Sequence, residues 1–265
     1  MLEIAPVQID VLHGHLLPAL YQAQAVQGWS KGMFHVIDSL LAYHLPEHGR
    51  LLELGCGGGH FLHHWQQHHP QQTLYGVDLH SEALPQAEYL LERRAHFNQG
   101  NILSLPFADA VFAGVVAFDV FDQRGVDTMM ALRESHRVLG TNGWLLLRVS
   151  AHQWLYGSHD IAFNTAHRFA KQELGDLVES AGFQVQRITY ANSFLAGPLI
   201  LLRLLQRWQW IGLSEATYRS YLTNRLLELT LQREAAFLKT KNLPVGLSLY
   251  LLARKCSAHK QMRTK

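Results

Sequence analysis

A run of apolar residues passes directly into a glycine-rich turn early in the chain. Residues 51–60 read LLELGCGGGH, and a helical pattern with Phe61, Leu62 and Trp65 on one face follows. Glycines let a ligand approach the backbone because no Cβ stands in the way, and the first N–H groups of a helix have no partners within it. The pattern therefore predicts a strand, a ligand-binding turn and a helix in succession.

An aspartate follows this turn at the spacing of a nucleoside site. Asp78 ends the next apolar run, 73–77, where a carboxylate can accept hydrogen bonds from both hydroxyls of a ribose. A dinucleotide fingerprint would also need a small residue at position 60, which is His60 here. We therefore expect a nucleoside-containing cofactor, and a nicotinamide dinucleotide is the weaker alternative.

Strand-like and helical patterns alternate through most of the chain. The strand-like runs span 50–54, 73–77, 113–118, 144–149, 184–190 and 246–253, the last one after a leucine-rich helical stretch. Strands that alternate with helices predict a mostly parallel sheet with helices on both faces. We expect one α/β domain with a helical insertion before the last strand.

The predicted divisions of this domain follow from the same patterns. They are a helical cap over 1–48, a cofactor-binding core over 49–190, a helical lid over 191–242, a final strand over 243–255 and a basic tail over 256–265.

Charge and cysteine content limit the kinds of partner and the cellular compartment that we expect. The net charge is +2 and the basic residues are scattered, so we expect no nucleic-acid track and take a small molecule as the substrate. Cys56 and Cys256 are the only cysteines, and the first residues resemble no signal peptide, which favours the cytoplasm. Pro198 and Arg203 interrupt the apolar run 194–205, so we expect no transmembrane segment. A homodimer contact through this insertion is favoured over a membrane-surface contact, which stays the weaker alternative.

The glycine-rich turn belongs to a longer series of motifs. The pattern Glu53-x-Gly55-x-Gly57-x-Gly59 resembles motif I of the class I S-adenosylmethionine-dependent methyltransferases. Residues 100–107 are similar to the adenine-binding turn of that family, with Asn101 in place of the commoner aspartate. Residues 116–122 and 136–144 resemble the later motifs, although Asp122-Gln123 stands where many members have Glu-His.

The resemblance implies a fold, a cofactor and a set of binding residues. The fold is a seven-stranded Rossmann-like sheet whose last strand, 246–253, inserts antiparallel, and S-adenosyl-L-methionine is the methyl donor. The implied cofactor-binding residues are Glu53, Gly55, Cys56, Gly57, Gly59, Asp78, Leu79, Asn101, Ile102, Phe118 and Asp119. The chain is also similar to a bacterial small-molecule subgroup with residues equivalent to Trp29, Trp154, His159, Asp160 and Arg168.

The acceptor side is less specific. Methyl transfer to an O, N or C atom requires positioning, and a general base where the acceptor must lose a proton. His159 and His167 follow the fifth strand-like run, near the expected carboxyl edge of the sheet, so they are the candidate catalytic residues, although either could simply cap a loop.

A row of histidines follows the glycine-rich turn. His60, His64 and His68 share a helical face, but no carboxylate lies on it, so we expect a solvated row and no metal site. The alternatives to a methyltransferase are an NAD(P)-dependent oxidoreductase and a non-catalytic protein of the same fold that uses the insertion as its interface.

Overall fold

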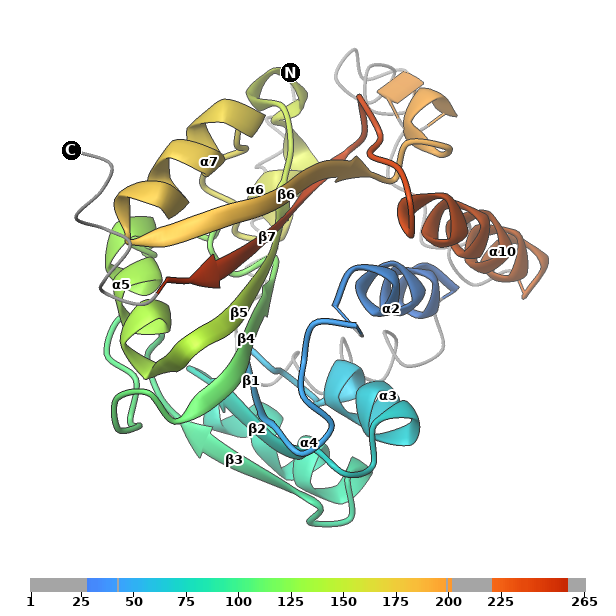
Figure 1. The fold of residues 1–265 in the computed structure, drawn as a ribbon. Coiled ribbons are helices and arrows are strands. Elements are labelled where there is room, and N and C mark those ends of the chain that lie inside the picture. The colour runs from blue at the N-terminus through green and yellow to red at the C-terminus, as the bar shows by residue number, and fades with distance from the viewer. Residues whose placement is uncertain (1–27, 42, 199, 202–220, 257–265) are drawn as a thin grey trace, which may run out of the picture.

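A seven-stranded sheet forms the centre of the protein (Figure 1). The computed structural model describes residues 28–41, 43–198, 200–201 and 221–256. The strands are β1 (Arg50–Leu54), β2 (Thr73–Asp78), β3 (Ala95–Gln99), β4 (Phe112–Phe118), β5 (Leu139–Ser150), β6 (Phe183–Ala191) and β7 (Ser248–Lys255). Their order is β3-β2-β1-β4-β5-β7-β6, and β7 is antiparallel to both of its neighbours. The predicted seven-stranded fold is therefore confirmed.

Two details of the sheet differ from the sequence prediction. Strand β3 was not predicted, because it is an edge strand in which polar residues outnumber apolar ones. Strand β5 begins at Leu139 and not at Trp144: Leu139 pairs with Phe112 and Trp144 pairs with Gly114, so residues 140–143 bulge out of the ladder.

Helices cover both faces of the sheet. On one face lie α2 (Gly28–Leu41), α3 (His60–His68), α4 (Leu84–Leu90) and α10 (Tyr221–Leu238), and on the other lie α5 (Thr128–Val138) and α7 (Lys171–Ser180). Neighbouring residues of a strand enter different cores: Leu51 packs with α2 and α3, whereas Leu52 packs with α5 and α7. This alternation is the reason that the strand runs are apolar at nearly every position.

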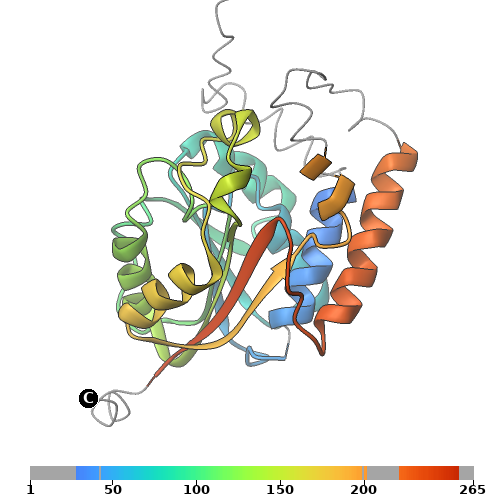
Figure 2. The ribbon, with the colours of Figure 1, turned by 90° about the horizontal axis from the view of Figure 1, so that it is seen from above.

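Helices α2 and α10 lie side by side although they come from opposite ends of the chain (Figure 2). A Cβ on Gly32 would lie 2.5 Å from Cβ of Leu231, so the two helices meet at this glycine. The buried carboxylate of Glu234 on α10 accepts backbone N–H groups from Asn192, Ser193 and Phe194, just after β6. The helix pair is thereby fixed to the end of the sheet.

Several sequence predictions fall partly outside the described residues. These are residues 1–27 of the predicted cap, residues 199 and 202–220 of the predicted lid and dimer contact, and residues 257–265 of the tail. Within the described ranges, no helix combines the length and the apolar character that a membrane crossing requires.

Candidate functional site

The glycine-rich turn joins β1 to α3 at the carboxyl edge of the sheet. Gly55, Gly57 and Gly59 have φ angles of 70°, 48° and 76°, a conformation that residues with a Cβ rarely adopt. A Cβ on Gly55 would lie 2.4 Å from Cγ2 of Val120. The turn therefore needs glycine both for its backbone conformation and for its packing against the segment after β4.

Asp78 at the end of β2 holds this turn in place. Its Oδ2 accepts the N–H of Gly57 at 2.8 Å and its Oδ1 accepts the N–H of His80 at 2.9 Å. A carboxylate oxygen can accept more than one hydrogen bond, so each oxygen can still receive a ligand hydroxyl. The next residue, Leu79, exposes 60% of its surface at the same edge.

A buried acid without a full set of partners lies directly before the turn. Glu53 is 5% exposed, and among the described residues its Oε2 has no hydrogen-bond partner. Burial raises the pKa of Glu53 well above its usual value, and Asp78 raises it further, against an opposing effect of Arg148. Such an acid gains stability from a ligand that brings a positive charge. A cofactor with an amino-acid moiety, such as S-adenosylmethionine, fits this requirement.

Cys56 packs against β2, where a Cβ on Gly76 would lie 2.7 Å from its Sγ. Its side chain is buried, and burial raises the pKa of the thiol well above its usual value, with Glu53 and Asp78 raising it further. The thiol is therefore protonated at neutral pH, which removes the nucleophilic form.

Asn101 and Ile102 lie beside Asp78, since Gly100 N donates to the backbone oxygen of Asp78 at 2.9 Å. Asn101 is exposed and its Oδ1 accepts the N–H of Leu103 at 2.9 Å, while Ile102 is buried. The structure thus brings together the residues after β1, β2 and β3 that the sequence pointed to.

The end of β4 carries a partly buried ion pair that was not predicted from the sequence. Nε of Arg148, on β5, donates to Oδ1 of Asp119 at 3.0 Å, and its Nη2 bonds to Oδ2. Asp119 has a φ of 56°, and the Arg148 guanidinium lies 5.5 Å from the centre of the Phe118 ring. The sequence signal was an isolated arginine within an otherwise apolar strand.

Asp122 connects the segment after β4 to the end of β5. It is 2% exposed, and its Oδ2 accepts the N–H of Ser150 at 2.8 Å. Burial raises the pKa of Asp122 to about 6, and the nearby Asp119 contributes to the increase. The two strands are thus tied together at the edge that carries the candidate site.

The predicted catalytic histidines both lie in the segment between β5 and α7. His159, on the short helix α6 (Ser158–Ala162), stacks on Phe163 with the ring centres 4.5 Å apart. His167 lies 2.8 Å from Oε1 of Glu173 through its Nε2. Asp160, next to His159, instead forms a buried ion pair with Arg168, at 2.6 Å.

A third histidine in this segment was not predicted. His152 follows β5 with a φ of 65°, and its Nε2 is buried without a partner among the described residues. Its ring stacks on Tyr190, which lies near the end of β6, with centres 5.0 Å apart and planes within 7°. Positive φ in a residue other than glycine is the signal here, and it cannot be read from sequence alone.

The predicted solvated row on α3 is wrong for His64. Its Nε2 lies 2.7 Å from Oδ2 of Asp38, and its ring stacks on Phe34, because α2 packs against α3. Across the ranges that the structure describes, no group of three or more His, Cys, Asp or Glu side chains is placed to hold a metal ion.

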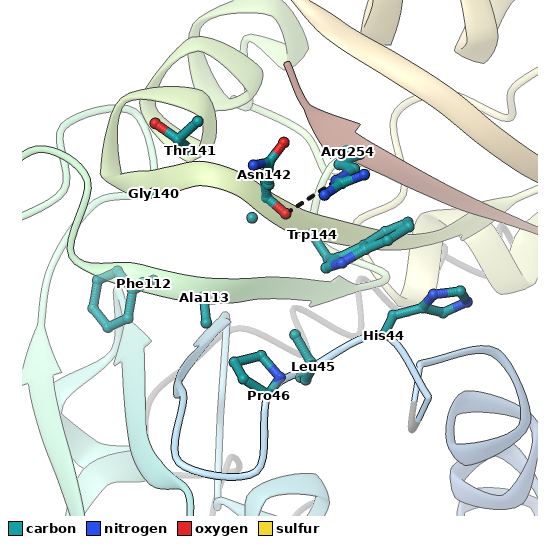
Figure 3. Close-up of a pocket in the computed structure, with 11 residues that line it drawn as sticks. His44, Leu45, Pro46, Phe112, Ala113, Gly140, Thr141, Asn142, Trp144 and Arg254 are labelled. Carbon is teal, nitrogen blue, oxygen red and sulfur yellow. Dashed lines mark hydrogen bonds between the residues drawn. The ribbon is translucent and has the colours of Figure 1, made fainter. Parts of the chain in front are cut away.

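Two hollows of about 430 Å³ each lie away from the glycine-rich turn. One is lined by Asp122, His167 and Glu173 together with apolar side chains of the loops before α5 and α7. The other lies at the opposite edge of the sheet, where the bulge in β5 faces His44, Trp144 and Arg254 (Figure 3). This second hollow contains none of the predicted site residues.

Comparison with known proteins gives a consistent assignment. The methyltransferase domain model matches residues 52–147. Malonyl-[acyl-carrier protein] O-methyltransferase from Erwinia billingiae is 33% identical over 110 residues, which cover 41% of this chain and 42% of that protein. The biotin biosynthesis bifunctional protein BioHC from Teredinibacter turnerae is 25% identical over 57% of this chain and 30% of its own length. The chain thus spans less than half the length of these relatives.

Solved structures share the fold at low sequence identity. A methyltransferase bound to the Trm112 activator of Haloferax volcanii has a TM-score of 0.62 at 18% identity, over 95% of this chain and 97% of that one. Phosphoethanolamine N-methyltransferase 2 from Haemonchus contortus, bound to S-adenosyl-L-methionine, has a TM-score of 0.62 at 16% identity, over 94% and 58%.

Proposed function

Because the chain belongs to the class I S-adenosylmethionine-dependent methyltransferase family, we propose that it transfers a methyl group to an O, N or C atom of a small-molecule acceptor. The observation that carries this proposal is the buried Glu53, which directly precedes a turn of glycines with positive φ and whose Oε2 has no hydrogen-bond partner among the described residues. Free Cys56 and Cys256 agree with a reducing compartment, and we propose the cytoplasm. Membership of the narrower bacterial subgroup stays a prediction.

The residues of the candidate site have proposed roles in binding the methyl donor. S-adenosylmethionine, when bound, supplies the methyl group from its sulfonium. We assign Asp78 to the ribose hydroxyls, Glu53 to the amino group, and Asn101 and Ile102 to the adenine. The remaining predicted residues of the turn, with Leu79, Phe118 and Asp119, would form the walls of the cofactor site, and the Arg148 ion pair would hold Asp119 in position.

A ligand screen tests the proposal against its two alternatives. S-adenosylhomocysteine should raise the melting temperature, since a ligand at 100 times its Kd stabilises a protein by about 2.7 kcal/mol. An increase with NAD or NADP alone would support the oxidoreductase. Donor binding without release of S-adenosylhomocysteine across a broad acceptor panel would support the non-catalytic alternative.

Donor binding should also depend on pH through Glu53. Because burial raises its pKa, Glu53 is protonated in the free protein below that pKa, and a donor ammonium favours the carboxylate, so binding releases a proton. Donor affinity should therefore fall as the pH is lowered through the raised pKa of Glu53, by up to about tenfold per pH unit. Calorimetry in phosphate and in Tris at one pH measures the release. The Glu53→Gln variant should show none; equal proton release in both proteins would contradict the assignment.

We further propose that His159 or His167 accepts the proton of a hydroxyl acceptor. Alanine at the responsible position should lower kcat by about 10²-fold or more and remove one ionisation from the pH–rate profile, while donor Kd is unchanged. His167 is oriented by Glu173, so Glu173→Gln should alter the pH–rate profile if His167 is the base. Full kcat in both alanine variants would exclude both histidines.

A further inference from the structure

Three segments at the carboxyl edge of the sheet are free of charged residues. They are residues 153–157, after β5, residues 193–198 and 200–201, after β6, and residues 243–247, before β7; none of these residues is Asp, Glu, Lys or Arg. Because β7 is antiparallel to β5 and β6, its beginning lies at the same edge as their ends (Figure 1).

These segments are packed into one unit. Buried Leu155, Ala196 and Leu247 form a small separate core, one residue from each segment, and Ile200 packs against it. Hydrogen bonds reinforce the contact: Ala151 N donates to the backbone oxygen of Leu247 at 3.0 Å, and the Ser193 hydroxyl donates to that of Val245. Residues far apart in sequence therefore present a common surface.

Large apolar side chains point outward around this small core. Trp154 and Leu201 are each 57% exposed, Val245 is 49% exposed and Phe194 is 48% exposed. We call these four residues the apolar rim. Single exposed apolar residues need no explanation, but a charge-free group of large ones around a shared core is typical of a binding surface.

The segments that carry the apolar rim start close to the segment after β4. Asp122, three residues after Asp119, receives the N–H of Ser150, and the stacked His152 and Tyr190 rings join the ends of β5 and β6. In the strand order, β7 and β6 lie on the side of β5 away from β2, which ends at Asp78. The apolar rim therefore lies on that side of the carboxyl edge.

We propose that the apolar rim binds the apolar body of the acceptor, a hydrocarbon chain or ring that carries the atom to be methylated. This proposal rests on the proposed function. A highly charged acceptor would find no ionic partner on these segments, whereas burial of a hydrocarbon against them is favourable. Surfaces that bind anionic membranes are usually rich in Lys and Arg, which these segments lack, so the small ligand is favoured over a lipid surface.

The test compares acceptors that share a head group and differ in chain length. Butylamine and decylamine, butyric and decanoic acid, and phenol and 4-octylphenol form three such pairs, with released S-adenosylhomocysteine as the readout. We expect the longer member of at least one pair to have a kcat/KM at least tenfold higher. The variants Trp154→Ser and Val245→Ser should reduce that gain without changing donor Kd. Tyr89→Ser, which alters an aromatic residue 86% exposed on α4, is the matched control.

A binding measurement keeps the proposal testable if none of these acceptors is methylated. The uncharged fluorophore N-phenyl-1-naphthylamine should bind the S-adenosylhomocysteine complex, and Trp154→Ser should weaken its binding at least fivefold while Tyr89→Ser does not. Absence of both chain-length dependence and rim-dependent fluorophore binding would overturn the inference. A protein that does not bind S-adenosylhomocysteine at all would instead refute the proposed function.

Two further outcomes would assign the rim to another occupant. Sedimentation with phosphatidylcholine vesicles that is lost in Trp154→Ser, without any chain-length effect, would identify a membrane surface. Stronger fluorophore binding after replacement of residues 202–220 by a Gly-Ser linker, again without a chain-length effect, would identify that segment as the occupant. Either result overturns the proposal for the acceptor.

Discussion

Replacement of Asp78 by alanine is expected to weaken S-adenosylmethionine binding by about a hundredfold or more. Each charge-assisted hydrogen bond to a ribose hydroxyl contributes about 1.5–3 kcal/mol, and two such bonds are lost. The structure adds a second cause, because the N–H groups of Gly57 and His80 lose their acceptor and the turn is held less firmly. Isothermal titration calorimetry with the donor measures the change.

Two variants serve as controls for this prediction. Asp78→Asn keeps one acceptor oxygen, so its loss of affinity should be smaller than that of Asp78→Ala. Glu82→Ala removes an exposed acid four residues away and should leave the affinity unchanged. A folded Asp78→Ala protein with the affinity of the unmodified chain would refute the ribose assignment and move the donor elsewhere.

The Arg168→Met variant should lose about 3–5 kcal/mol of folding free energy, because removal of one partner leaves the other charge buried and unpaired. Arg168 and Asp160 are 2% and 1% exposed at their side chains and lie 2.6 Å apart. Nη1 of Arg168 also donates to the backbone oxygen of Ala151 at 2.9 Å, so that oxygen loses a donor as well. Urea denaturation followed by circular dichroism gives the difference.

Two comparisons identify the cause of this loss. Arg94→Met disrupts an ion pair with Glu92 whose side chains are 60% and 73% exposed, and exposed pairs contribute at most about 1 kcal/mol. The double variant Arg168→Met, Asp160→Leu removes both buried charges and should recover part of the stability. Equal losses in Arg168→Met and Arg94→Met would show that burial is not the source of the effect.

The features that the sequence predicted best are local. The glycine-rich turn and Asp78 were predicted because each follows directly from a short apolar run, and the spacing between them is fixed by one helix. Strand β3 was missed because an edge strand needs no apolar faces, and its pairing with β2 is decided by the sheet.

The features that were missed depend on contacts between distant residues. The Arg148–Asp119 pair joins residues 29 positions apart, and the Gly28 N–H donates to Oδ1 of Asn224 across 196 positions. The predicted solvated row on α3 was wrong for the same reason, since Asp38 reaches His64 only after α2 has packed. Sequence patterns describe one segment at a time and do not show which segments become neighbours.

The strand order separates the protein into two halves that could evolve at different rates. The residues proposed to bind the donor lie at or just after the ends of β1, β2, β3 and β4, whereas the apolar rim belongs to segments after β5 and β6 and before β7. Ser150 and Asp122 are a link between the halves, because the backbone N–H of Ser150 donates to the side-chain Oδ2 of Asp122. Grafting residues 153–157, 193–201 and 243–247 from a relative would therefore change the rim without a single substitution in the donor turn. The scaffold is in this sense suited to directed evolution of acceptor choice.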